Sequence, residues 1–153
     1  MKKYILLFLG LFFSLCALAQ SDEKGPVASY FTPFTALDNF NNGGVTNNPS
    51  VATTFTVSVS CLITTIQTYH WNNGRGAATG TIKLIHSNGT VYGPWTATGI
   101  AGSGGVANAF WNVTPNTVIP AGTYTVVDSD KATWSCNTQS QNKGFTKVFA
   151  KRR

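Results

Sequence analysis

The chain has 153 residues, of which 42% are hydrophobic and 10% charged, and its formal net charge at pH 7 is +6. Its length suits one domain, and its plentiful aromatic and β-branched residues exclude an intrinsically disordered chain. The basic residues are scattered apart from the terminal Lys151-Arg152-Arg153. A face of clustered Lys and Arg among aromatics is therefore missing, and no nucleic-acid partner is expected.

The first residues have the three parts of a secretory signal peptide. Lys2 and Lys3 precede an apolar run from Tyr4 to Leu15, and Ala17-Leu18-Ala19 then places small residues at alternate positions. We expect cleavage after Ala19 and a secreted, periplasmic or extracellular bacterial protein that begins at Gln20. The apolar run is short for a span of about 20 residues. No later stretch is apolar enough to cross a membrane, so no membrane span is expected after cleavage. A retained membrane anchor is the alternative.

The expected organisation is a signal peptide (1–19), a loose polar segment (20–26), a β-sandwich domain (27–150) and a basic tail (151–153). Helical periodicity is absent after the signal, and β-type runs alternate with turn residues. About eight strands are expected, at 27–37, 54–61, 62–71, 79–87, 90–98, 106–113, 122–127 and 144–150. This number favours an all-β, jelly-roll-like sandwich of two sheets.

Several runs also predict details of the sheets. In Thr54 to Cys61 the apolar residues Phe55, Val57 and Val59 alternate with polar ones, which predicts one buried face. The run from Leu62 to Trp71 is apolar on both parities, which indicates a strand covered on both faces or broken by a bulge. Asn88-Gly89 predicts a hairpin turn. Gly93-Pro94 in its second arm indicates an edge strand or a bulge.

Two cysteines, Cys61 and Cys136, remain once Cys16 leaves with the signal peptide. A lone pair in an oxidising compartment is expected to be bridged. Closing so long a loop stabilises the folded chain by about 4 kcal/mol on the chain-entropy account. The sequence therefore predicts a Cys61–Cys136 disulfide.

The stretch from Ile66 to Trp134 resembles a recurrent β-sandwich module of secreted bacterial proteins, found alone or appended to larger extracellular chains. The residues that carry the resemblance are Tyr69-His70-Trp71-Asn72-Asn73-Gly74-Arg75-Gly76, Tyr92-Gly93-Pro94-Trp95, Ile119-Pro120-Ala121-Gly122-Thr123-Tyr124, Asp128-Ser129-Asp130 and Ala132-Thr133-Trp134-Ser135. They cover about half of the expected domain. The resemblance implies a fold and an exported location only, and it offers no catalytic residues to carry over to this chain. The cysteine pair is not a feature of that module.

Side chains suited to a sugar site follow two of the predicted strands. Sandwich loops cluster at the two ends of the fold, so both groups could share one end. Aromatic faces would stack on sugar rings, while amides, a guanidinium and carboxylates would bond hydroxyl groups. The candidate ligand-binding residues are Tyr69, Trp71, Asn73, Arg75, Asp128, Asp130 and Trp134.

A structural interpretation of the same residues stays open. Trp71, Trp95 and Trp111 could pack in the core or across strands, since Trp is mostly buried. Arg75 could form a salt bridge with Asp128 or Asp130 that holds a loop in place.

Cofactor and catalytic signals are sparse. Asp128-Ser129-Asp130 could start a calcium site, but the later Glu of a calcium loop is missing, so no metal or other cofactor is expected. Neither G-x-S-x-G nor H-E-x-x-H occurs in the sequence. Asp38, Asp128 and Asp130 are the carboxylates that a glycoside hydrolase could use.

The expected function is a non-enzymatic, secreted binding module whose ligand is a carbohydrate or cell-surface glycan. A structural or adhesive extracellular protein is the main alternative, and a small hydrolase is a further one. Exposed, clustered Trp71 and Trp134 would favour binding, whereas buried tryptophans with a flat exposed edge strand would favour the structural alternative.

Overall fold

The computed structural model describes residues 32–152. The expected signal peptide, the segment 20–26 and residues 27–31 of the expected domain lie outside this range, as does Arg153. The described strands are β1 (Thr32–Asp38), β2 (Thr46–Asn47), β3 (Thr53–Val57), β4 (Cys61–Tyr69), β5 (Thr81–His86), β6 (Val91–Thr96), β7 (Thr98–Ile100), β8 (Phe110–Val113), β9 (Thr117–Ile119), β10 (Gly122–Asp128), β11 (Ser135–Cys136) and β12 (Thr146–Arg152). Two short 3₁₀ turns, η1 (Asn72–Gly74) and η2 (Ser103–Gly105), lie between strands.

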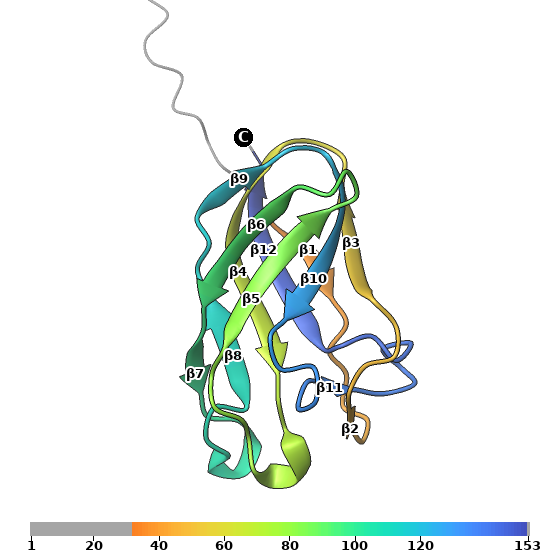
Figure 1. The fold of residues 1–153 in the computed structure, drawn as a ribbon, viewed down its shortest axis with the longest axis vertical. Coiled ribbons are helices and arrows are strands. Elements are labelled where there is room, and N and C mark those ends of the chain that lie inside the picture. Colours follow the sequence, from red (N-terminus) through yellow and green to blue (C-terminus); the bar gives the residue numbers. More distant parts are fainter. Residues whose placement is uncertain (1–31, 153) are drawn as a thin grey trace, which may run out of the picture.

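Ten of the described strands form two antiparallel sheets packed face to face (Figure 1), and β2 and β11 pair in a small third sheet. The first sheet has the order β1-β12-β4-β8-β7, with β9 also pairing β4, and the second has the order β3-β10-β5-β6. The eight strands of four or more residues thus have the order of a jelly roll, with β1-β12-β4-β8 in one sheet and β3-β10-β5-β6 in the other. The prediction of an all-β, jelly-roll-like sandwich is confirmed. The strands beyond the expected eight are two or three residues long.

The strands predicted from apolar alternation at 54–61 and 62–71 correspond to β3 and β4, with one error in the buried residues. Phe55 and Val57 are buried as expected, but Val59 is 48% exposed because it lies in the turn between the two strands. In β4 the predicted bulge is confirmed, since the register with β12 shifts between Phe149 and Ala150. That extra residue lets Ile63 and Ile66, which have opposite parity, both face the core.

The predicted hairpin joins β5 and β6. The Gly89 N–H donates to the His86 carbonyl at 2.8 Å, and Gly89 has a φ of 91° while Asn88 is not among the residues with positive φ. This is a type I turn followed by one left-handed glycine, which is the common three-residue hairpin loop. As Gly93-Pro94 indicated, β6 is an edge strand, and its register with β5 is irregular.

The core lies between the sheets and is closed at one end by a tyrosine. Tyr124 of β10 is fully buried, and its hydroxyl donates to the Pro120 carbonyl at 2.8 Å, four residues upstream. This contact is of the tyrosine-corner type that ties a strand to the preceding connection in β-sandwiches. It holds β10 between β3 and β5.

The expected boundary between the domain and a basic tail at residue 151 is wrong, because the last strand runs to Arg152. Lys151 and Arg152 belong to β12, an inner strand of the first sheet, where Arg152 pairs with Thr32 of β1 and Cys61 of β4. The Arg152 guanidinium also lies 4.6 Å from the centre of the Phe34 ring. Hydrogen bonding on both sides of β12 keeps these residues in the sheet.

The predicted disulfide is wrong, because both thiols are free and buried. Cys61 begins β4, whereas Cys136 follows Ser135, whose hydroxyl binds the Trp71 backbone beyond the other end of β4. At about 3.3 Å per residue the two ends of this strand lie roughly 26 Å apart. A disulfide requires a Cα separation of about 4.4–6.8 Å, so the two cysteines cannot meet.

Helices play almost no part in the described chain. Within residues 32–152 there is no helix with the length and apolarity needed to cross a bilayer.

Candidate functional site

The two segments of the predicted site do meet at one end of the sandwich. The Trp71 N–H, just beyond β4, donates to the Ser135 hydroxyl at 2.9 Å, and the Asn48 N–H donates to the Trp134 carbonyl at 3.0 Å. Figure 1 shows this end below the sheets, where η1, β2 and β11 lie. The predicted residues are therefore neighbours, but they are divided between the interior and the surface.

Asp128 is an interior residue. Its side chain and that of His70 are both fully buried, with 3.1 Å between Asp128 Oδ2 and His70 Nε2. The Thr68 hydroxyl donates to the same oxygen at 2.8 Å, and His70 Nδ1 lies 2.9 Å from the Thr133 hydroxyl. Since burial of a charge is costly unless it is paired and hydrogen-bonded, this network satisfies Asp128 from within the protein. The prediction that Asp128 contacts a ligand is not supported.

Trp134 is also part of the core. It is 5% exposed, and its indole N–H donates to the Phe145 carbonyl at 3.0 Å. Trp111 is fully buried and stacks on His70 with a centroid separation of 3.8 Å. For Trp111, and for Trp95, which packs against the core, the structural interpretation is correct. The prediction that Trp134 stacks on a ligand is not supported, because Trp134 is buried.

Three other predicted residues lie in local turns. The Asp130 carboxylate accepts a hydrogen bond from the Thr133 hydroxyl at 2.7 Å, so it fixes the turn after β10. Asn73 is exposed in η1 with a φ of 55°, and the exposed Arg75 donates from Nε to the Asn72 carbonyl at 3.4 Å. No salt bridge joins Arg75 to either aspartate among the described residues.

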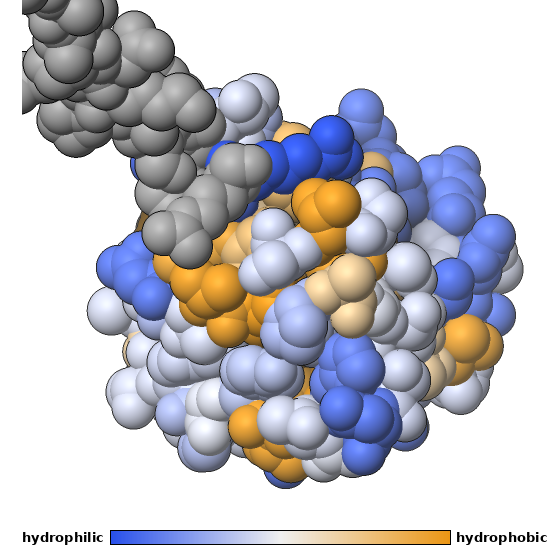
Figure 2. Space-filling model, turned by 90° about the horizontal axis from the view of Figure 1, so that it is seen from above, coloured by the Kyte–Doolittle hydropathy of each residue, from blue (hydrophilic) through white to orange (hydrophobic). Residues whose placement is uncertain are grey.

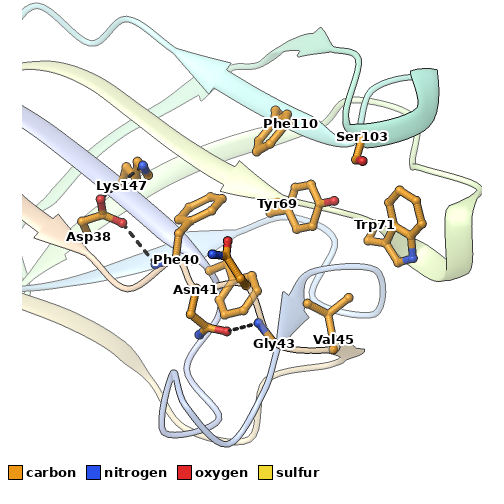
Figure 3. A pocket seen from close by; sticks show the side chains of 13 residues that line it. Asp38, Phe40, Asn41, Gly43, Val45, Tyr69, Trp71, Ser103, Phe110 and Lys147 are labelled. Carbon is orange, nitrogen blue, oxygen red and sulfur yellow. Dashed lines mark hydrogen bonds and ion pairs between the residues drawn. The ribbon is translucent and has the colours of Figure 1, made fainter.

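The remaining two predicted residues, Tyr69 and Trp71, line a groove of about 760 Å³ on the outer face of the first sheet. Alternation along β4 explains their direction, because Thr68 and His70 point into the core. We call this site the aromatic groove. Its lining consists of Asp38, Phe40, Asn41, Asn42, Gly43, Gly44, Val45, Tyr69, Trp71, Ser103, Phe110, Phe145 and Lys147. Figure 3 shows them gathered from the loop after β1 and from β4, β8, η2 and β12.

Five aromatic rings line the groove, and four of them pack against one another. Tyr69 and Phe110 are directly paired across β4 and β8, with ring centroids 4.7 Å apart. Phe40 lies over them at 6.0 and 6.1 Å and stacks on Phe145 at 5.5 Å. Such contacts hold the rings in place. Partial burial raises the pKa of the Tyr69 hydroxyl above its ordinary value of 10.0, so it stays a neutral donor at physiological pH.

Polar groups complete the groove. Lys147 Nζ lies 3.2 Å from Asp38 Oδ2 and 5.2 Å from the centre of the Phe40 ring. Asn41 is locked in place, because it exchanges side-chain hydrogen bonds with Asn137 at 2.7 and 3.1 Å and accepts the Gly43 N–H at 3.0 Å. The loop after β1, residues 39–45, is thus held in place beside the aromatic rings.

Sequence reasoning missed Phe40, Phe110 and Lys147. Phe40 lies outside the predicted strands, beside the turn-forming residues Asn41-Asn42-Gly43-Gly44. Phe110 and Asn112 alternate with the buried Trp111 and Val113, so the period of two in that run already indicated two faces. Lys147 was treated as one of several scattered charges.

The described residues include no group of three or more His, Cys, Asp or Glu side chains placed to hold a metal ion. Asp128 and Asp130, the candidate start of a calcium site, bond instead to neighbouring protein groups. Comparison with known proteins adds no relative. No protein-family model, curated protein or solved structure matches this chain.

Proposed function

We propose that the protein is a secreted, non-catalytic module that binds carbohydrate in the aromatic groove. The single observation that carries this proposal is the meeting of Tyr69, Phe110 and Trp71 with Asn41 and Lys147 in one groove of about 760 Å³. Its volume lies in the range of about 300–1,000 Å³ typical of ligand pockets. Aromatic faces suit the apolar faces of sugar rings, and amides, hydroxyls and an ammonium suit their hydroxyl groups. The predicted signal peptide and the resemblance to secreted bacterial modules support export.

The carboxylates favour binding over hydrolysis. Glycoside hydrolases generally use two carboxyl groups that flank the scissile bond, about 5–9.5 Å apart. Among the residues that line the groove, Asp38 is the one carboxylate, and it is paired with Lys147. The other described aspartates, Asp128 and Asp130, are engaged in the interior and in a turn.

Glycan-array screening of the purified mature chain, followed by isothermal titration with the best binder, tests this proposal. Trp71→Ala should weaken binding about 3- to 10-fold, because one aromatic contact contributes about 0.5–1.5 kcal/mol beyond area burial and 1.4 kcal/mol is a factor of ten. Trp71 is half-buried at the rim, so the variant should keep its fold. Thermal unfolding checks this.

Val118→Ala is the matched control. Val118 is 60% exposed on β9, and the residue paired with it, Leu62, lies at the start of β4, far from the groove. The control should bind like the parent protein. Absence of any glycan binding, or equal binding by Trp71→Ala, would overturn the proposal.

An adhesive or structural role is the second candidate, and one surface favours it. At the end opposite η1 and β11, Val59 and Val118 are exposed, and Figure 2 shows hydrophobic side chains gathered there beside hydrophilic ones. Such exposed apolar residues can mark protein contacts. Sedimentation analysis of the parent protein and of Val59→Ser with Val118→Ser distinguishes the candidates, since self-association lost in the double variant would support adhesion.

A further inference from the structure

A row of polar side chains crosses the outer face of the first sheet. Strand register aligns the row, because Lys147 pairs with Asp38 and Gln67, while Asn112 pairs with Gln67 and Thr98. We call these five residues the polar row. It crosses five strands, β1, β12, β4, β8 and β7, which at about 4.8 Å between strands gives a length of roughly 19 Å.

The polar row faces solvent because its neighbours along each strand are buried. Ile66 and Thr68 flank Gln67, and both are fully buried. The same alternation applies to β8, where Trp111 and Val113 flank Asn112. Alternate residues of a strand point to opposite faces, so the polar row and the core lie on opposite sides of the sheet.

The row contains groups that can still bond a ligand. Gln67 Nε2 donates to Asn112 Oδ1 at 2.9 Å, which fixes both amides. The side-chain oxygen Oε1 of Gln67 and the side-chain Nδ2 hydrogens of Asn112 have no hydrogen-bond partner among residues 32–152. A fixed amide with a free donor or acceptor is the kind of group that orients a hydroxyl-rich ligand.

A row of apolar side chains lies beside the polar row. Phe110 pairs with Tyr69 on one side and with Ile100 of β7 on the other. Tyr69 and Phe110 are each two residues from Gln67 and Asn112 along their strands, or about 7 Å. Asp38 and Lys147 belong both to the aromatic groove and to the polar row. The groove is therefore continuous with a surface made of two parallel rows, one of apolar side chains and one of polar side chains.

Charge on this surface cancels. Asp38 and Lys147 form an ion pair at 3.2 Å, and the other members of the polar row are neutral. The surplus positive charge of the described chain lies outside the polar row. It is carried by Arg75 in the turn after β4, Lys83 in the second sheet, Lys131 and Lys143 in loops, and Lys151 and Arg152 at the far end of β12. An acidic ligand would meet the Asp38 carboxylate without a free cation in the row.

From this juxtaposition we infer that the ligand is a linear, uncharged polysaccharide laid across the strands of the first sheet. The inference rests on the proposed function and specifies it. Successive sugar units stack on the apolar row and bond to the polar row, so recognition requires several units of an internal chain segment.

Titration calorimetry with oligosaccharides of increasing length tests the inference. The probes are cellohexaose, xylohexaose, mannohexaose and the hexamer of N-acetylglucosamine, with a mannuronate hexamer as the acidic comparison. At least one neutral hexamer should bind, at least tenfold more tightly than its own disaccharide, and more tightly than the acidic hexamer. Asn112→Ala should weaken binding of the hexamer several-fold and leave binding of the disaccharide unchanged. Trp71→Ala should weaken binding of both.

Thr123→Ala is the matched control, because Thr123 is an exposed, hydrogen-bonded residue of β10 in the other sheet. Gln67→Ala is a second variant if Asn112→Ala unfolds. Equal affinity for disaccharide and hexamer, or preference for the acidic hexamer, overturns the inference and leaves the proposed function standing if Trp71→Ala still weakens binding. Failure of every sugar to bind overturns both.

Discussion

At the scale of single residues, burial decides which polar groups can meet a ligand. Asp128 and Asp38 are both aspartates on the described chain, yet the first is fully buried against His70 and the second is partly exposed beside Lys147. The same residue type therefore stabilises the interior in one place and lines a groove in the other. Tyr69 and Trp71 line the groove, whereas His70 between them is buried. Successive residues of an extended chain point in opposite directions.

We expect Asp128→Ala to lower the free energy of unfolding by about 3–5 kcal/mol, because removing one partner leaves the other polar group buried and unpaired. Urea unfolding measures the change. The loss includes the hydrogen bonds from His70 and Thr68.

Asp38→Ala is the control for that prediction. Its ion pair with Lys147 is partly exposed, and such surface pairs contribute about 0–1 kcal/mol. A cost for Asp128→Ala no greater than that of Asp38→Ala would contradict the account of the buried network.

At the scale of elements, β4 organises the molecule. It pairs with β12, β8 and β9, its bulge turns two isoleucines into the core, and its end carries two residues of the aromatic groove. The strand also separates the two cysteines, since Cys61 lies at its beginning and Cys136 near its end.

We expect the mature protein, unfolded without reductant, to titrate two thiols. Reductant should leave its melting temperature unchanged, because no covalent loop constrains the unfolded chain. In the folded protein both thiols should react slowly with a thiol reagent, since both are buried. An absence of thiols in the unreduced protein, or a melting temperature that falls on reduction, would contradict this prediction.

At the scale of the whole molecule, three weakly acidic side chains that are wholly or partly buried respond to high pH. Burial raises the pKa of the Cys61 thiol above its ordinary value of 9.0, although the positive charge of Arg152 opposes this. Burial also raises the pKa values of the Tyr69 and Tyr124 hydroxyls. The neighbouring Tyr92 raises the pKa of Tyr124 further. The folded chain thus keeps protons that the unfolded chain loses.

Stability should therefore be fully present below pH 9 as far as these groups are concerned. It should fall as the pH rises above 9 and then 10, since the unfolded state loses its protons first. Denaturant unfolding from pH 7 to 11 measures the decline, and Cys61→Ala should make it shallower between pH 9 and 10. A free energy of unfolding that stays constant to pH 11 would show that these groups do not titrate differently in the two states.

Much of the architecture could be predicted from sequence because each β-strand carries its own signal. Apolar alternation, the both-parity pattern of Leu62 to Trp71 and the Asn88-Gly89 turn depend on neighbours within a few residues. They located the eight strands and the bulge. Such local patterns cannot show where a strand stops against a turn, which is why Val59 was placed inside.

The candidate site required tertiary structure. Sequence reasoning brought the segments around Trp71 and Trp134 to one end, where they do meet. It could not decide that Trp134 and Asp128 turn inward while Phe40 and Lys147, from opposite termini of the domain, join Tyr69 on the surface. The strand pattern follows from residues close together in the chain, whereas the groove depends on strand register and on the packing of two sheets. For that physical reason the sequence by itself determined a jelly-roll sandwich, and only the tertiary structure decided which side chains it presents to a ligand.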